Sequence, residues 1–358
     1  MDLFTAVALS MLPASRSRVA STFKEIRHRT ISSATALLEL VLHGCDVPED
    51  SWRDAIATAC SRAKDALAAA DKAEMIPLAW CDPAYPVLLN CVSDPPPVLW
   101  VRGEPALLAR PTVAIVGSRA ATPYAADIGY RLGRELSDRG VIVASGLARG
   151  VDSAAHRGSL SGLSPTVAVL GSGLDRVYPA SHAALAREIS QKGLLVSELG
   201  PGAAPLPEHF PLRNRIISGI SLGVVVVEAS EKSGSLITAR CALEQGREVM
   251  AVPGNVLSGR NRGSHSLLKD GAKVIESAVD ILEGLGWTGA DMTQIAKAKP
   301  LYRDGLLSKM EAGEVYRLDE LMELTGVTGT RLLPRLMELE LAGLVTQTGS
   351  GFSRRLVT

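Results

Sequence analysis

The sequence predicts an α/β protein built on a doubly wound, Rossmann-like parallel sheet, with a small helical domain before it and a winged helix after it. Between residues 110 and 285, short β-branched runs alternate with Gly-rich turns and amphipathic helical stretches. The runs are apolar throughout, which is typical of parallel strands covered on both faces. Residues 301–358 instead show helical periodicity followed by a two-stranded hairpin pattern, as in a winged helix.

The first part of the chain is predicted to be a helical domain over residues 1–81. Residues 14–75 are rich in Ala, Ser and Arg and place their apolar residues at helical spacing. The Pro-rich stretch 82–103 then favours extended and turn structure. We expect this stretch to pack onto the domain that follows.

The Rossmann-like domain is predicted to span residues 82–285. Its expected strands are "TVAIVG", "VIVASG", "TVAVLG", "LLVSELG", "GVVVVEAS", "EVMAVPG" and "AKVI". Expected helices between them include 122–138, 181–191 and 235–245. In such a sheet, ligands bind beyond the carboxyl ends of the strands, so the loops there are the first place to look for function.

A linker at 286–300 and a winged helix at 301–358 complete the predicted organisation. The predicted recognition helix, 328–343, carries Pro334 in its first turns and mixes two arginines with two glutamates: Arg331, Arg335, Glu338 and Glu340. The wing adds Arg354 and Arg355. Both a protein contact and a duplex DNA contact therefore stay open for this domain.

Composition excludes several classes of protein. The formal net charge is +0, so affinity for nucleic acid has to come from a local patch. The five cysteines form no CxxC pair, which argues against a disulfide framework or a zinc site. The N-terminus does not resemble a signal peptide, and no apolar run reaches the ~18 residues of a membrane helix. We expect a cytoplasmic protein that does not insert into membranes.

The loops at the strand ends are rich in Gly and Ser, and several run directly into helices. Backbone N–H groups at helix N-termini favour an anion such as phosphate. A dinucleotide fingerprint is incomplete, because "GSGLDR" has Arg176 where a third Gly is needed, and there is no Walker A motif. We predict no bound cofactor and no metal.

The candidates for catalysis are few. Asp152 and His156 have i,i+4 spacing and could form an acid–base pair, or Asp152 caps a helix and His156 is a core residue. Glu228 follows a strand and is either catalytic or a partner for nearby hydroxyl and N–H groups. No GxSxG nucleophile turn is present. We predict no catalytic residue.

The remaining chemistry is cationic. Five arginines are predicted in strand-end loops of one sheet edge, together with Phe210: Arg119, Arg149, Arg176, Arg213 and Arg215. Guanidinium groups pair with phosphates, and an aromatic ring gives an unstacked base a surface. The set suits single-stranded nucleic acid. The alternative is that Phe210 belongs to the core and the arginines pair with carboxylates.

Seven segments, in order, resemble one family. They are "YPVLLNCVSDPPPVLWVRG", "VAIVGSRAATPYA", "VASGLARGVDSAAHRGSL", "AVLGSGLDRVYP", "SELGPGAAPLPEHFPLRNRIISG", "VVEASEKSGSLITARCALEQGREVMAVPG" and "LLKDGAKVI". Together they are similar to the DNA processing protein A (DprA, also called Smf) family over about 82–283. The N-terminal domain lacks the "LPGVG" type of opening that is usual in that family.

The resemblance implies a non-enzymatic protein that binds and protects single-stranded DNA during natural transformation and recombination. It also implies loading of RecA, displacement of single-strand-binding protein, and a homodimer formed by the Rossmann-like domain. In that family the DNA pocket uses the Arg of "GSR" and the "FPxRNR" segment. The candidate nucleic-acid-binding residues are Ser118, Arg119, Gly146, Arg149, Ser172, Gly173, Phe210, Arg213, Asn214, Arg215, Ser233 and Gly234.

Two other functions compete with this one. Rossmann-like nucleoside-monophosphate phosphoribohydrolases place a catalytic Glu in the loop occupied here by "SGSLITARC", but Arg240 stands at that position. A regulator in which the sheet domain senses a ligand and the winged helix reads DNA is the third hypothesis. The mixed charge of the predicted recognition helix disfavours it.

Overall fold

The computed structural model describes most of the chain in two compact units, residues 1–298 and 299–358. The described residues are 2–26, 34–43, 45, 47–287, 306, 309, 310, 314–325, 329, 332, 333, 336, 339, 340, 345–348 and 351–354. Within these ranges, no helix has both the length and the apolar composition needed to cross a bilayer. Of the winged-helix residues named above, five lie outside these ranges, namely Arg331, Pro334, Arg335, Glu338 and Arg355.

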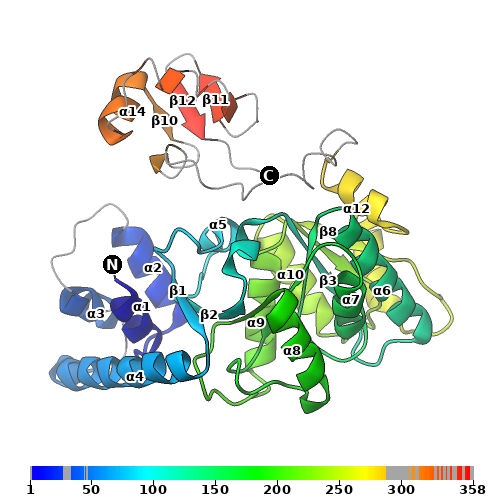
Figure 1. The fold of residues 1–358 in the computed structure, drawn as a ribbon, viewed down its shortest axis with the longest axis horizontal. Coiled ribbons are helices and arrows are strands. Elements are labelled where there is room, and N and C mark those ends of the chain that lie inside the picture. Colours follow the sequence, from blue (N-terminus) through cyan, green and yellow to red (C-terminus); the bar gives the residue numbers. More distant parts are fainter. Residues whose placement is uncertain are drawn as a thin grey trace. The chain divides into compact units, whose positions relative to one another are not determined.

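The first unit is organised around a nine-stranded sheet with the order β1-β2-β6-β5-β4-β3-β7-β8-β9. Figure 1 labels β1, β2, β3 and β8 of this sheet. The strands are β1 (Ile76–Ala79), β2 (Val98–Gly103), β3 (Thr112–Val116), β4 (Ile142–Ser145), β5 (Thr166–Leu170), β6 (Leu194–Ser197), β7 (Gly223–Val226), β8 (Glu248–Ala251) and β9 (Lys273–Val274). The seven from β3 to β9 pair in parallel, while β2 pairs antiparallel with β6 and β1 pairs antiparallel with β2. The Rossmann-like fold class is confirmed.

Helices cover both faces of this sheet because alternate residues of its apolar strands point to opposite sides. Val113 and Ile115 of β3 pack into one core with α6, α7 and α12. Ala114 and Val116 pack into another with α9 and α10. The helices after the first four are α5 (Val87–Asn90), α6 (Pro123–Asp138), α7 (Val151–Leu160), α8 (Ala183–Lys192), α9 (His209–Gly219), α10 (Ser235–Glu244), α11 (Arg262–Lys269) and α12 (Ala278–Gly284).

The N-terminal helices share a core with the antiparallel end of the sheet. They are α1 (Leu3–Ser10), α2 (Arg16–Ile26), α3 (Ala34–Leu42) and α4 (Trp52–Lys72). Their apolar side chains meet Trp100 of β2 and Ile189 of α8, which are both buried. The chain then enters the sheet directly through β1, so helical and sheet parts are continuous here.

The strand order reverses between β3 and β7. The chain first builds the sheet outward through β4, β5 and β6, and then returns to add β7 on the other side of β3. The loops after β3 and β7 therefore diverge to opposite faces of the sheet and leave a crevice at its carboxyl edge. Ligand-binding residues are expected at this edge.

The second unit contains a three-stranded antiparallel sheet with the order β10-β12-β11. Its described elements are β10 (Val315–Tyr316), α14 (Leu318–Thr325), β11 (Val345–Thr348) and β12 (Gly351–Arg354). Leu321, Leu336 and Phe352 belong to its separate core. The predicted hairpin is confirmed as β11 and β12, which pair in register from Val345 opposite Arg354 to Thr348 opposite Gly351.

Candidate functional site

A pocket of about 340 Å³ opens at the carboxyl edge of the sheet. Its walls are the turn Gly117–Ala120 after β3, the start of α7, one face of α9 and the N-terminal end of α10. We call it the switch-point pocket. Because α10 begins at Ser235, the positive end of its helix dipole and the hydroxyl groups of Ser233 and Ser235 lie in the wall, where they favour a negatively charged group.

One face of α9 lines this pocket. The prediction that Phe210, Arg213 and Arg215 lie in a strand-end loop is wrong, because His209–Gly219 is helical. Pro211 lies in the first turn, where its missing N–H has no helical partner to lose. The α9 residues in the wall are Phe210, Pro211, Arg213, Asn214 and Ile217. All but Pro211 follow the i, i+3, i+4, i+7 spacing of one helix face.

Arg119 and Phe210 meet at the mouth of the pocket. The guanidinium carbon of Arg119 lies 5.5 Å from the centre of the Phe210 ring, within the range of a cation–π contact. Tyr178 packs against the same ring at a tilt of 52°, with 5.4 Å between ring centres. Phe210 is half-buried and Arg119 is exposed. The alternative that Phe210 is a core residue therefore does not hold.

Arg213 lines the same pocket but is almost fully buried, with 5% exposure. Its Nη1 donates to the carbonyl oxygen of Gly146 at 2.7 Å and to that of Val169. Burial lowers the pKa of Arg213 to about 10, partly offset by the charge of Asp152. A Cβ on Gly146 would lie 2.6 Å from the guanidinium nitrogens, so only glycine leaves room here. Arg213 thus braces the loop after β4.

Asp152 is the buried counter-charge of Arg213. Its Oδ2 accepts the N–H of Gly146 at 3.1 Å. Burial raises the pKa of Asp152, while Arg213 and the N–H groups of Ala148, Gly146 and Gly117 act in the opposite direction. The helix itself begins after Gly150, whose φ of +76° and close approach to the Ser118 carbonyl both require glycine. Asp152 therefore stabilises the β4 loop and is not a free acid.

His156 is a core residue, fully shielded from solvent. Its Nδ1 lies 2.7 Å from Oγ1 of Thr166, whose own hydroxyl donates to the carbonyl of Val143. Burial, with smaller contributions from Arg213 and His182, lowers the pKa of His156 to about 3. The side chain is neutral at physiological pH and has no route to a ligand in the pocket. An acid–base pair with Asp152 is not supported.

This depressed pKa predicts that the protein loses stability as the pH falls below about 6.5. In the unfolded chain this histidine has an ordinary pKa near 6.5 and is protonated as the pH falls, whereas in the folded protein it stays neutral. We expect His156 alone to cost about 2 kcal/mol between pH 6.5 and 5, at about 1.4 kcal/mol per pH unit. Urea unfolding of wild type and His156→Asn at both pH values checks this. An equal change in the free energy of unfolding between the two pH values in both proteins would contradict it.

Glu228 holds the turn after β3 in place. It is buried, and its carboxylate accepts the hydroxyl of Thr122 at 2.7 Å and the N–H of Thr122 at 3.2 Å. Its carbonyl oxygen accepts the N–H of Ser118 at 2.8 Å. Of the two sequence alternatives, the structure supports the binding of nearby hydroxyl and N–H groups.

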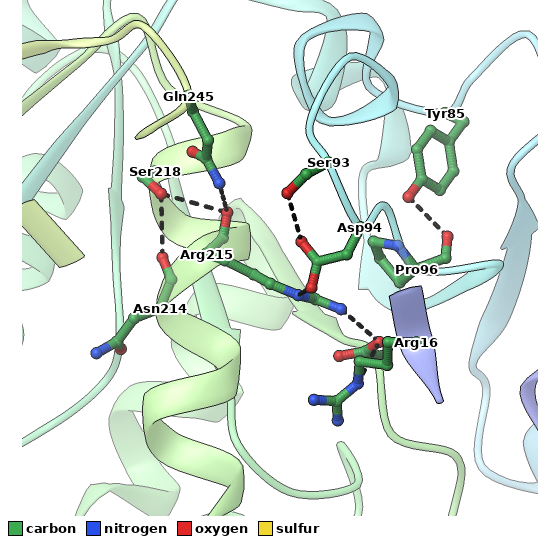
Figure 2. A network of polar contacts seen from close by, with 10 residues as sticks. Arg16, Tyr85, Ser93, Asp94, Pro96, Asn214, Arg215, Ser218 and Gln245 are labelled. Carbon is green, nitrogen blue, oxygen red and sulfur yellow. Dashed lines mark hydrogen bonds and ion pairs between the residues drawn. The ribbon is translucent and has the colours of Figure 1, made fainter. Parts of the chain in front are cut away.

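Arg215 points away from the switch-point pocket and is buried in an ionic cluster on the other side of α9 (Figure 2). Its Nε donates to Asp94 at 2.8 Å and its Nη2 to Glu198 at 2.7 Å. Nε of Arg16 lies 3.4 Å from the same Glu198 oxygen. The cluster therefore joins α2, the Pro-rich stretch, the loop after β6 and α9. For Arg215, the alternative of pairing with carboxylates is the observed one.

The other predicted residues divide into two groups. Ser118, Asn214, Ser233 and Gly234 line the pocket, and Asn214 Nδ2 donates to the Gly234 carbonyl at 3.3 Å. Four others do not line it. Ser172 bonds through its hydroxyl to the Arg176 carbonyl in a tight turn that includes Gly173, while Arg149 and Arg176 are exposed. Tyr178, the ring partner of Phe210, was missed because nothing in the sequence places it beside α9.

The chain matches two family models and several relatives. The family model described as DNA recombination-mediator protein A matches residues 77–286, and the DprA winged helix domain matches 290–351. "Protein Smf" of Escherichia coli (strain K12) is 42% identical over 280 residues, 75% of this chain and 75% of that protein. DNA processing protein DprA of Streptococcus pneumoniae is 45% identical over 201 residues, 56% of this chain and 71% of that protein.

Two solved structures agree with the sequence comparisons. An X-ray structure of DprA from Streptococcus pneumoniae has a TM-score of 0.69 and 33% identity, covering 79% of this chain and 98% of that one. A structure of DprA from Helicobacter pylori, described as showing that protein's single-stranded DNA binding mode, has a TM-score of 0.54 and 31% identity. It covers 59% of this chain and 95% of that one.

Proposed function

Because the chain belongs to the DNA recombination-mediator protein A (DprA/Smf) family of DNA-processing proteins, we propose that its switch-point pocket binds single-stranded DNA. The observation that carries the proposal is the exposed guanidinium of Arg119 held 5.5 Å from the Phe210 ring at the pocket mouth. An exposed cation can pair with the phosphate of a nucleotide, and the aromatic ring beside it can stack on the base of the same nucleotide.

The shape of the pocket favours a single strand over a duplex. A hollow of about 340 Å³ can take one base only if that base has left the stack. The polar wall at the start of α10, with Ser233 and Gly234, adds hydroxyl and N–H donors for a phosphate. Binding of this kind contacts backbone and ring faces and is expected to show little sequence preference.

The pocket supports binding better than catalysis. Its one buried carboxylate, Asp152, is engaged by Arg213 and by backbone N–H groups, and His156 is sealed in the core. Arg240 replaces the Glu of the phosphoribohydrolases. We therefore propose a non-enzymatic role, and neither the phosphoribohydrolase nor the ligand-sensing regulator is favoured.

The wider role follows from the family. We propose that the protein protects incoming single-stranded DNA in the cytoplasm, loads RecA on it and displaces single-strand-binding protein, as a homodimer formed by its Rossmann-like domain. The domain boundaries at 81/82 and 285/286 and the linker at 286–300 stay predictions. For the winged helix, we propose a contact with protein or with duplex DNA.

Arg119→Ala is expected to weaken binding of a labelled single-stranded oligonucleotide about tenfold, because one exposed phosphate contact is lost. The slope of log affinity against log salt should shrink by about 0.7, the value for one phosphate of a single strand. Fluorescence anisotropy over a salt series measures both. Arg187→Ala is the matched control, because Arg187 is an exposed arginine of α8 outside the pocket. Equal affinity for the Arg119 and Arg187 variants would remove the pocket from the proposal.

A further inference from the structure

A second pocket, of about 660 Å³, opens at the same edge of the sheet. It lies between the start of α6, the loop after β7 and the loop between β8 and α11. The residues that define it are Thr122, Tyr124, Glu228, Asn255, Ser258 and Asn261. We call it the Tyr124 pocket. Its lining has no Lys or Arg, and its polar groups are amides, hydroxyls and one carboxylate.

The turn after β3 is the wall between the two pockets. Gly117–Ala120 line the switch-point pocket, while Thr122 and Tyr124 line the Tyr124 pocket. Glu228 fixes this wall at both ends, through Ser118 and through Thr122. From Ala120 to Tyr124 the chain advances four residues, so the two hollows lie within about 14 Å of each other along the wall.

An arginine stands on each side of this wall. Arg119 lies over Phe210 on the switch-point side. On the other side, Nη1 of Arg260 donates to the carbonyl oxygen of Ala120 at 2.8 Å, which holds that guanidinium at the turn that separates the two pockets. Arg260 belongs to the same loop as Asn255 and Ser258 of the Tyr124 pocket, and it is exposed. A phosphate that passes over this turn would lie near both guanidinium groups.

Tyr124 is the aromatic surface of the second pocket. It is 55% exposed although it lines a hollow, and aromatic residues make up only 4% of the chain. Exposed rings of this kind stack on bases, whereas amide and hydroxyl groups bond to base edges. A lining with a carboxylate and without cations repels phosphate and suits a base.

We propose that the Tyr124 pocket is a second base subsite, which takes the neighbouring base of the strand held in the switch-point pocket. The connecting phosphate crosses the wall at Ala120, between Arg119 and Arg260. Tyr124 stacks on the base, and Asn255, Ser258 and Asn261 face its edge. This inference rests on the proposed function and extends the site from one nucleotide to two.

The test compares Tyr124→Ala with Tyr130→Ala. Tyr130 is also an exposed tyrosine of α6, but it lies outside the pocket and bonds to Ser161 at 3.0 Å. Anisotropy is measured with a labelled dodecamer and with a strand of equal length in which abasic sites replace the bases. We expect Tyr124→Ala to bind the dodecamer about 5- to 100-fold more weakly than Tyr130→Ala, as lost stacking on one base predicts. On the abasic strand the two variants should be equal.

The outcomes separate this inference from the proposed function. If Arg119→Ala weakens binding and Tyr124→Ala matches Tyr130→Ala on the dodecamer, the second subsite is wrong and the first stands. If Tyr124→Ala also binds the abasic strand more weakly than Tyr130→Ala does, and by the same factor as on the dodecamer, the ring stabilises the wall and does not stack on a base. That result also overturns the subsite. If wild type binds neither strand, both the function and the subsite fail.

Discussion

Replacing Arg213 by methionine is expected to lower the free energy of unfolding by about 3–5 kcal/mol, because the buried carboxylate of Asp152 loses its neighbouring positive charge. Arg213 is 5% exposed, and it braces the carbonyls of Gly146 and Val169. Without it, Asp152 keeps a buried charge with no counter-ion. Urea unfolding of wild type and variant measures the loss.

Two further measurements identify Asp152 as the source of this loss. Since Arg213 acts to lower the pKa of Asp152, its removal raises that pKa further above the unfolded value. A buried carboxyl group whose pKa is raised in the folded protein destabilises the fold when it is ionised and much less when it is protonated. The loss of stability caused by Arg213→Met should therefore be smaller at pH 5 than at pH 8. Adding Asp152→Asn to Arg213→Met should recover part of the stability. A penalty that does not change with pH or with Asp152→Asn would exclude this explanation.

The same geometry decides which variants can report on DNA binding. A loss of binding in Arg213→Met would follow from a displaced β4 loop as readily as from a lost phosphate contact. Arg119 is exposed, so its replacement leaves the bracing of Gly146 untouched. Arg119→Ala should therefore unfold at the same urea concentration as wild type, and it is the variant that tests the contact itself.

The sequence was sufficient for the parallel part of the sheet, because each of its seven apolar runs became a strand from β3 to β9. It did not predict the antiparallel strands β1 and β2, and β1 lies within the stretch expected to be helical. It placed Arg119 and Phe210 at one edge, and the structure brings them within 5.5 Å. It went wrong over α9, where the prolines and the neighbouring Gly-rich stretch suggested a loop. Pro211 is tolerated in a first turn, so it does not distinguish a loop from a helix start.

The helical structure of this segment explains why the two arginines of "RNR" lie on opposite sides of α9. In a loop, Arg213 and Arg215 could face one ligand. In a helix, residues two apart lie about 200° apart around the axis, so they point to opposite sides. The helical spacing of Phe210, Arg213, Asn214 and Ile217 would have separated them. The partners of Arg215 come from distant stretches, Asp94 and Glu198, and no local pattern in the sequence indicates them.

The second large effect is expected from Arg215→Met, which should cost about 3 kcal/mol of stability. Asp94 and Glu198 then lack the guanidinium that bridges them in this partly buried site, while Arg16 remains beside Glu198. The loss should reach beyond α9, because the cluster connects α2 and the Pro-rich stretch to the sheet. Limited proteolysis of the first unit, together with urea unfolding, detects that loosening.

Matched variants separate the ionic contribution from the packing of the side chain. Arg187→Met removes an exposed arginine and should change stability little. Arg215→Lys keeps the charge, but a single ammonium cannot reproduce the fork that reaches Asp94 through Nε and Glu198 through Nη2, so an intermediate loss is expected. Arg215→Met combined with Glu198→Gln should lose less than the sum of the single variants, because the second change relieves the repulsion created by the first. Strict additivity would mean that Arg215 acts through packing alone, and that the connection between α2 and the sheet depends on other contacts.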